Sequence, residues 1–205
     1  GLIDQMFRKY DQEVLVMNAG VGNYNTERYI TSFFEKYEKL EPTDIIINYF
    51  LRDAEDLNPS KPNFLLRNSQ MAVTVWTAFN RLFKNTGAQS IEKHYQDIYE
   101  SQSDGFKKMA RKLEELSKFA KERNIRIYIL MVPDINNLID YKFEYIHKKI
   151  AKLAIQYEYI FVDSLPYFKG RSFESLYAMP GDPHPNALGH KIMAETIFPY
   201  LMNTN

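Results

Sequence analysis

The sequence contains no cysteine among its 205 residues. Disulfide bonds, a thiolate nucleophile and cysteine-ligated metals are therefore excluded, whereas the cellular compartment stays open. The 26 Lys and Arg residues are balanced by 26 Asp and Glu residues, so no positive excess favours a nucleic-acid partner. No apolar run is long enough to cross a bilayer, which predicts no transmembrane segment.

Glycine is also scarce, with 8 residues, and none forms a phosphate-binding loop or a dinucleotide fingerprint. His94 and His147 have no second ligand at a spacing typical of metal sites. The sequence therefore predicts neither a cofactor nor a catalytic metal. A flavodoxin-like cofactor protein remains a third functional alternative, disfavoured by the lack of a phosphate loop.

Short apolar runs alternate with helical patterns along most of the chain. We expect buried parallel strands at four places, because such strands read as continuous runs of apolar residues. They are residues 14–18, 45–51, 125–132 and 159–163. Amphipathic patterns predict helices over 2–8, 29–40, 106–123, 145–157 and from 187 to about 202. This order favours a parallel sheet covered on both faces, a three-layer α/β/α sandwich of flavodoxin-like type.

Polar side chains follow the predicted strands. Gly20 and Gly22 come after the first of them, Arg52 and Asp53 after the second, and Asp134 after the third. Right-handed crossovers place the carboxyl ends of parallel strands at one edge of the sheet, where α/β proteins put their sites. Ion pairing of Arg52 with Asp53, Glu55 or Asp56 is a competing interpretation, as is helix capping by Asp134 or Asp163.

The stretch Gly181-Asp182-Pro183-His184-Pro185-Asn186 sets an acid two residues before a histidine, just ahead of the last helix. Two prolines limit the freedom of this predicted loop, and Asn186 is a candidate N-cap. A carboxylate that accepts from one imidazole nitrogen fixes the tautomer, which leaves the other nitrogen free to take a proton. Asp182 and His184 are therefore candidate catalytic residues.

With these motifs in order, the sequence resembles the SGNH hydrolases, also called GDSL-type esterases. Asn18-Ala19-Gly20-Val21-Gly22 looks like the family's second block, which implies that the Gly22 amide helps to bind an oxyanion. The stretch 49–55 looks like the third block, with Arg52 where the family has an oxyanion-binding Asn. Asp182-Pro183-His184 looks like the final block, which supplies acid and base. Asn23 and Asp53 complete the substrate-binding residues that the resemblance implies.

The family's first block, a Gly-Asp-Ser turn that supplies the nucleophile, is absent from the sequence. In the family that block follows a strand lying between those matched by residues 14–18 and 45–51. Three explanations are open: upstream residues of the natural protein are lacking, another chain supplies the strand, or the two strands pair directly. The first is preferred. None of the serines present has the surroundings of a nucleophile.

The resemblance implies one SGNH-like domain over residues 1–205, with a helical insertion at about 57–105 that contains an apolar segment, 64–83. It implies a serine esterase, O-acyltransferase or deacetylase acting on an acyl ester, such as that of a carbohydrate. The chain by itself would be inactive without the serine. The alternative is a non-catalytic domain that binds a glycan or acyl group, or acts as a scaffold. The compartment stays undetermined, and a preceding signal or anchor would place the domain outside the cytoplasm.

Overall fold

The computed structural model describes residues 1–57, 88–179 and 182–202. Its centre is a parallel sheet of β1 (Asp44–Tyr49), β2 (Arg126–Met131) and β3 (Ile160–Asp163), in the order β1-β2-β3. Ile47 of β1 lies opposite Ile129 of β2, which in turn lies opposite Phe161 of β3. The three apolar runs predicted as strands in this part of the chain are therefore confirmed.

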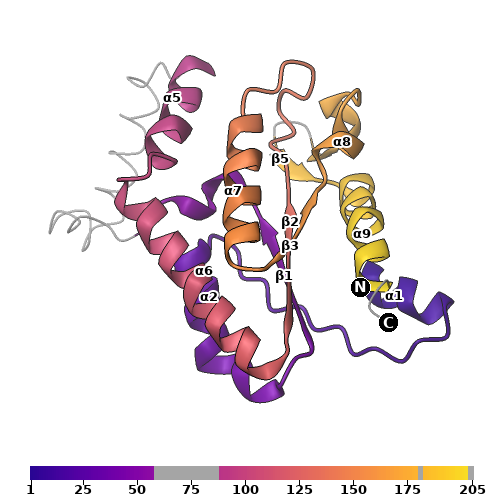
Figure 1. The fold of residues 1–205 in the computed structure, drawn as a ribbon. Coiled ribbons are helices and arrows are strands. Elements are labelled where there is room, and N and C mark those ends of the chain that lie inside the picture. Colours follow the sequence, from indigo (N-terminus) through magenta and orange to yellow (C-terminus); the bar gives the residue numbers. More distant parts are fainter. Residues whose placement is uncertain (58–87, 180–181, 203–205) are drawn as a thin grey trace, which may run out of the picture.

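Helices cover both faces of this sheet (Figure 1). On one face, Ile47, Ile129 and Met131 pack with side chains of α2 (Thr26–Ser32), α6 (Asp104–Arg123) and α7 (Glu144–Gln156). On the other face, Tyr128 and Leu130 pack with α1 (Leu2–Lys9) and α9 (Ala187–Met202). Alternate residues of β2 point into opposite cores because side chains alternate along a strand. The protein is thus a three-layer α/β/α sandwich, as predicted.

The helix ends follow simple capping chemistry. Asn25 Oδ1 accepts a hydrogen bond from Arg28 N at 3.0 Å and caps α2. Asn186 Oδ1 accepts from Leu188 N at 2.9 Å, which confirms the predicted cap of α9. The helix predicted to reach Leu40 continues beyond α2 only as a π-helical turn, η1 (Phe33–Tyr37), and a 3₁₀ turn, η2 (Glu38–Leu40). The remaining helices of the described residues are α5 (Ala88–Ile98), α8 (Leu165–Phe168) and the 3₁₀ turns η3 (Leu51–Ala54) and η4 (Phe173–Ser175).

Residues 14–18 do not form the buried strand that the sequence predicts. The segment has no strand pairing, and Leu15 and Met17 are 87% and 54% exposed. Val16 is partly buried and packs against the same apolar cluster as Ile46 of β1. The prediction was wrong because an apolar run forms a strand only where a neighbour pairs with its backbone. Within the described residues, β1 pairs with β2 alone.

A short antiparallel hairpin of β4 (Tyr177–Met179) and β5 (Asp182–Pro185) precedes α9. The stretch around His184 was predicted as a loop, and it is instead a strand in which Pro185 lies opposite Tyr177. Proline is tolerated in such an edge position because its missing N–H does not interrupt a central ladder. The predicted helical segment 64–83 lies outside the described residues.

Gly105 allows the close approach of α6 to η3. A Cβ atom built there would lie 2.2 Å from Ala54 O and 2.8 Å from Asp56 N, both backbone atoms. We predict that Gly105→Ala destabilises the protein by about 1–3 kcal/mol in urea unfolding, although alanine is the better helix former. Gly22→Ala is the matched control, since no heavy atom beyond Gly22 and its two chain neighbours lies within 4 Å of its Cβ position. Equal effects of the two substitutions would contradict the assignment.

Candidate functional site

The residues predicted to be functional lie at the carboxyl end of the sheet. In Figure 1 the turn after β1 and the strand β5 are both toward this end, the upper end of the view. Arg52 and Asp53 belong to η3, directly after β1. Asp182 and His184 belong to β5, next to the loop after β2, because Tyr177 of β4 donates from its hydroxyl to Asn136 Oδ1 at 2.8 Å.

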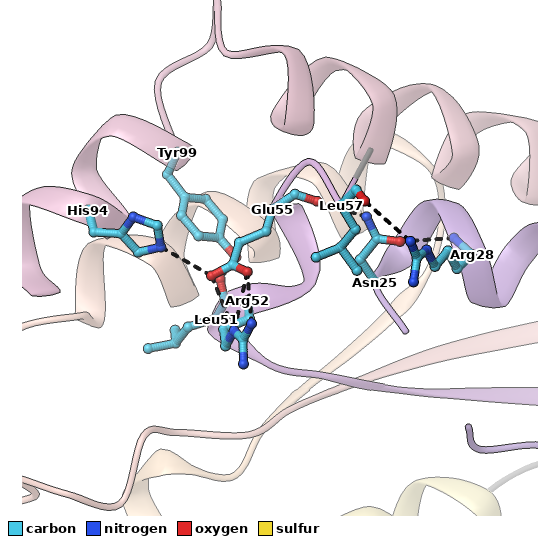
Figure 2. Close-up of polar contacts among 8 residues, drawn as sticks. All are labelled: Asn25, Arg28, Leu51, Arg52, Glu55, Leu57, His94 and Tyr99. Atoms are coloured by element: carbon cyan, nitrogen blue, oxygen red, sulfur yellow. Dashed lines mark hydrogen bonds and ion pairs between the residues drawn. The ribbon is translucent and has the colours of Figure 1, made fainter. Parts of the chain in front are cut away.

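Glu55 is the centre of a polar cluster in the turn after β1 (Figure 2). Arg52 donates to both of its carboxylate oxygens, with a shortest contact of 3.1 Å, and His94 Nε2 of α5 lies 3.1 Å from Glu55 Oε1. The Glu55 side chain is 14% exposed, whereas those of Arg52 and His94 are each 57% exposed. The competing interpretation of Arg52, an ion pair with a neighbouring acid, is confirmed with Glu55 as the partner.

The turn 51–57 is fixed from two sides. Asn25 Nδ2 donates to Glu55 O at 2.7 Å, and Arg28 donates to Leu57 O at 3.2 Å, so the start of α2 binds one side. On the other side the Tyr99 hydroxyl donates to Leu51 O at 3.0 Å (Figure 2). Asn25 follows the loop of Gly22 and Asn23 directly, so this bond joins two of the predicted loops.

Gly22 and Asn23 are exposed in a turn between the extended segment 14–18 and α2. Asn23 has a φ of 61°, a left-handed conformation that asparagine tolerates better than most residues. No heavy atom beyond Gly22 and its two chain neighbours lies within 4 Å of the position that a Cβ of Gly22 would occupy. The Gly22 backbone can therefore be approached closely by a bound molecule.

Asp53 is only 8% exposed, unlike the other predicted site residues of this turn. Burial away from water raises the pKa of its carboxyl group to about 8. Phe50 N donates to Asp53 Oδ2 at 3.3 Å, which opposes this shift only in part. The side chain is therefore mostly protonated at neutral pH, and it is placed to hold the turn rather than to contact a dissolved substrate.

His184 is exposed on the β4–β5 hairpin, and the hairpin is attached to the start of α9. Asn186 N donates to Leu176 O at 2.7 Å, and its side chain donates to Ser175 O at 2.8 Å. Gly189 lets α9 pack close to the hairpin, because a Cβ there would lie 2.7 Å from Pro185 Cβ. The backbone on the carboxyl side of His184 is thus held by α9.

An acid–histidine–tyrosine chain that the sequence analysis missed lies at the carboxyl end of β3. His147 Nδ1 is 2.8 Å from Asp163 Oδ1, and His147 Nε2 is 2.8 Å from the Tyr141 hydroxyl. His147 is 3% exposed. A signal was available, because His147 lies on the stripe of α7 that also carries Ile150 and Ala154, and a histidine on a buried stripe needs buried partners.

Three of the described serine hydroxyls make structural hydrogen bonds. Ser164, the serine that directly follows β3, is fully buried and donates to Met131 O at 2.7 Å. Ser117 donates to Tyr157 O, and Ser103 caps α6. Within residues 1–57, 88–179 and 182–202, no group of three or more His, Asp or Glu side chains could hold a metal ion.

Comparison with known proteins adds evidence on the fold. No family model matches the chain, and no curated protein sequence matches it. The structure is similar to the crystal structure of a Bacteroides fragilis NCTC 9343 protein that is provisionally named an acylhydrolase. The TM-score is 0.53 at 14% sequence identity, over 99% of this chain and 80% of the other. This likeness shows an acylhydrolase-like α/β fold.

No helix in the described part of the chain is both long enough and apolar enough to cross a bilayer. This agrees with the absence of a long apolar run from the sequence.

The raised pKa of Asp53 predicts a specific dependence of stability on pH. Because its folded-state pKa of about 8 exceeds that of an exposed aspartate, the folded protein keeps a proton that the unfolded chain releases. The contribution of Asp53 to stability therefore falls as the pH rises from roughly 4, the pKa of an exposed aspartate, towards the folded-state pKa. We expect the stability of Asp53→Asn relative to the wild type to increase by a few kcal/mol as the pH rises from about 5 to about 8.

Urea unfolding at several pH values measures this difference. Asp97→Asn, a substitution of an exposed aspartate on α5, is the control and should leave the pH dependence unchanged. A constant difference between Asp53→Asn and the wild type across the pH range would show that Asp53 titrates normally.

Proposed function

We propose that this chain forms the major part of an SGNH-type serine esterase or O-acyltransferase that acts on an acyl ester, such as an acetylated carbohydrate. His184 is the general base, and Asp182 orients its ring. The Gly22 amide stabilises the oxyanion of the tetrahedral intermediate. The nucleophilic serine arrives on an additional strand that pairs with β1. This strand is either continuous with the chain or part of another polypeptide.

The observation that carries this proposal is the unpaired edge of β1. Within the described residues β1 bonds to β2 on one side only, and its Ile45 and Ile46 are half-buried. Unpaired backbone donors and acceptors on an apolar edge are costly unless water or another strand satisfies them. The extended, apolar segment 14–18 contributes Val16 to the cluster that Ile46 contacts. One further strand beside β1 would offer pairing partners to both.

The carboxyl end of such a strand would lie close to the other candidate site residues. A parallel neighbour of β1 ends beside the turn 51–57, where the loop of Gly22 and Asn23 is already attached through Asn25. A serine at that point would lie at the carboxyl end of the sheet, the end toward which the β4–β5 hairpin with His184 also lies. The base, the oxyanion donor and the nucleophile would then come from three different loops at one end of the sheet.

The guanidinium of Arg52 is already bound to Glu55, through Nε and Nη2. A guanidinium has five N–H groups, so it can keep Glu55 and still donate one bond to a substrate. We propose that Arg52 and Asn23 contact the substrate around the oxyanion, and that the buried Asp53 supports the turn from below.

A fluorophosphonate probe tests the proposal, because it labels serines that an adjacent base activates. The full-length gene product is treated with the probe, and the adduct is located by peptide mapping. We expect a single adduct on a serine outside residues 1–205. His184→Ala should slow labelling and p-nitrophenyl acetate hydrolysis by about a thousandfold or more. His190→Ala changes an exposed histidine of α9 and should leave both unchanged.

Two outcomes would contradict the proposal. An adduct on Ser164 or another serine of this chain would remove the need for a complementing strand. No labelling at all, in a protein that binds acetylated oligosaccharides, would favour the alternative of a non-catalytic glycan- or acyl-binding domain. Arg52 held by Glu55 is the observation that favours this alternative.

A further inference from the structure

A continuous run of hydrogen bonds connects β3 with the hairpin that carries His184. It begins at Asp163, the last residue of β3, whose Oδ1 accepts from Leu165 N at 2.9 Å and lies 2.8 Å from His147 Nδ1. His147 Nε2 then lies 2.8 Å from the hydroxyl of Tyr141, in the loop that follows β2. Because His147 is buried between these elements, it links β3, α7 and that loop.

The direction of each bond follows for an ionised Asp163 carboxylate and a neutral His147 ring. An ionised carboxylate can only accept, so His147 Nδ1–H donates to Asp163. In the neutral ring Nε2 is then an acceptor, and the Tyr141 O–H donates to it. The Tyr141 oxygen is left to accept from Asp134 N, which lies 3.3 Å away. Every donor meets an acceptor, so the chain has one consistent arrangement.

The run continues into the hairpin. Asp134 Oδ1 accepts from Asn136 N at 2.8 Å and from Asn136 Nδ2 at 2.5 Å. These two bonds orient the Asn136 amide so that its oxygen accepts from the Tyr177 hydroxyl at 2.8 Å. Tyr177 belongs to β4 and lies opposite Pro185, the neighbour of His184. The carboxyl end of β3 is thereby joined to the hairpin through side chains and one backbone amide.

We propose that Asp163, His147 and Tyr141 are positioning residues that set the orientation of the hairpin, and through it of His184. This inference rests on the proposed function for its meaning in catalysis. A two-stranded hairpin with strands of three and four residues is not stable alone, so its position depends on what holds it. Asn186 and Gly189 fix its end at α9. The hydrogen-bonded run fixes the opposite strand.

The test removes single hydroxyl groups by substitution and measures the effect on the His184 ring and on the backbone of the hairpin. Tyr141→Phe deletes both bonds of the Tyr141 hydroxyl, and Tyr177→Phe deletes the bond to Asn136. Each substitution loses little volume, so both variants should fold. Tyr145→Phe, a partly exposed tyrosine of α7, is the matched control. Ring ¹⁵N resonances of labelled histidines and amide hydrogen exchange are measured in all of these proteins.

We expect Tyr141→Phe and Tyr177→Phe each to shift the His184 ring resonances and to speed amide exchange at Tyr177, Ala178, Met179 and His184 by about tenfold. This corresponds to about 1.4 kcal/mol, in the range of one hydrogen bond. The double variant should resemble either single variant, since both break the same run. The wild-type spectrum should show His147 with its proton on Nδ1. Tyr145→Phe should leave these signals unchanged.

The inference is overturned if Tyr141→Phe loosens only residues 133–143 and leaves His184 and residues 177–179 as in the wild type. It is also overturned if His147 carries its proton on Nε2. These readouts need no activity, so they separate the two proposals. Changed His184 signals in a protein without esterase activity would sustain the positioning role and reject the proposed function. In an active enzyme, Tyr141→Phe should lower kcat more than it changes KM.

Discussion

The parallel pairing of β2 with both of its neighbours is the constraint on which the rest of the structure depends. Five of the six residues of β2 are buried, so the strand needs a cover on each face. The cover of α2, α6 and α7 on one face and of α1 and α9 on the other follows from this requirement. The same pairing aligns the strands in one direction. The turn after β1, the loop after β2 and Asp163 therefore meet at one end of the sheet.

The sequence predicts this framework well, because its signals are local. The runs over 45–51, 125–132 and 159–163 are short, apolar and bounded by turns, and amphipathic helices separate them. Residues 14–18 have the same local signal and fail, because a strand is a property of two segments and the pattern of one cannot reveal its neighbour. The opposite error occurs at residues 182–185. Their prolines predict a loop, whereas the structure has a strand there, because a short edge hairpin accepts proline.

The candidate site shows the same contrast between local interactions, which a sequence can predict, and long-range ones, which it cannot. Capping by Asn186 and the ion pair of Arg52 involve residues within a few positions, and both were within reach of sequence reasoning. The partners of His147 were not, since Asp163 lies 16 residues away on another element. What the sequence did offer was a histidine on the apolar stripe of α7. A polar group at such a position indicates that a buried partner exists without saying which residue it is.

The two halves of the candidate site are held by different means, and this bears on how catalysis could be organised. The turn of Arg52 and Glu55 is fixed by charged and backbone contacts from α2 and α5 (Figure 2), and Asp53 beneath it is buried and mostly protonated at neutral pH. The hairpin of His184 is fixed by a run of hydrogen bonds, mostly between side chains, that leads back to β3. A base must reach a substrate hydroxyl within about 3 Å, and small displacements reduce its effect strongly. β3 belongs to the same sheet as β1, with β2 between them, so anchoring the hairpin to β3 fixes both halves of the candidate site to one sheet. A completing strand next to β1 would fix the nucleophile to the same sheet, directly through backbone hydrogen bonds, whereas His184 is fixed to it through the side chains that lead to β3.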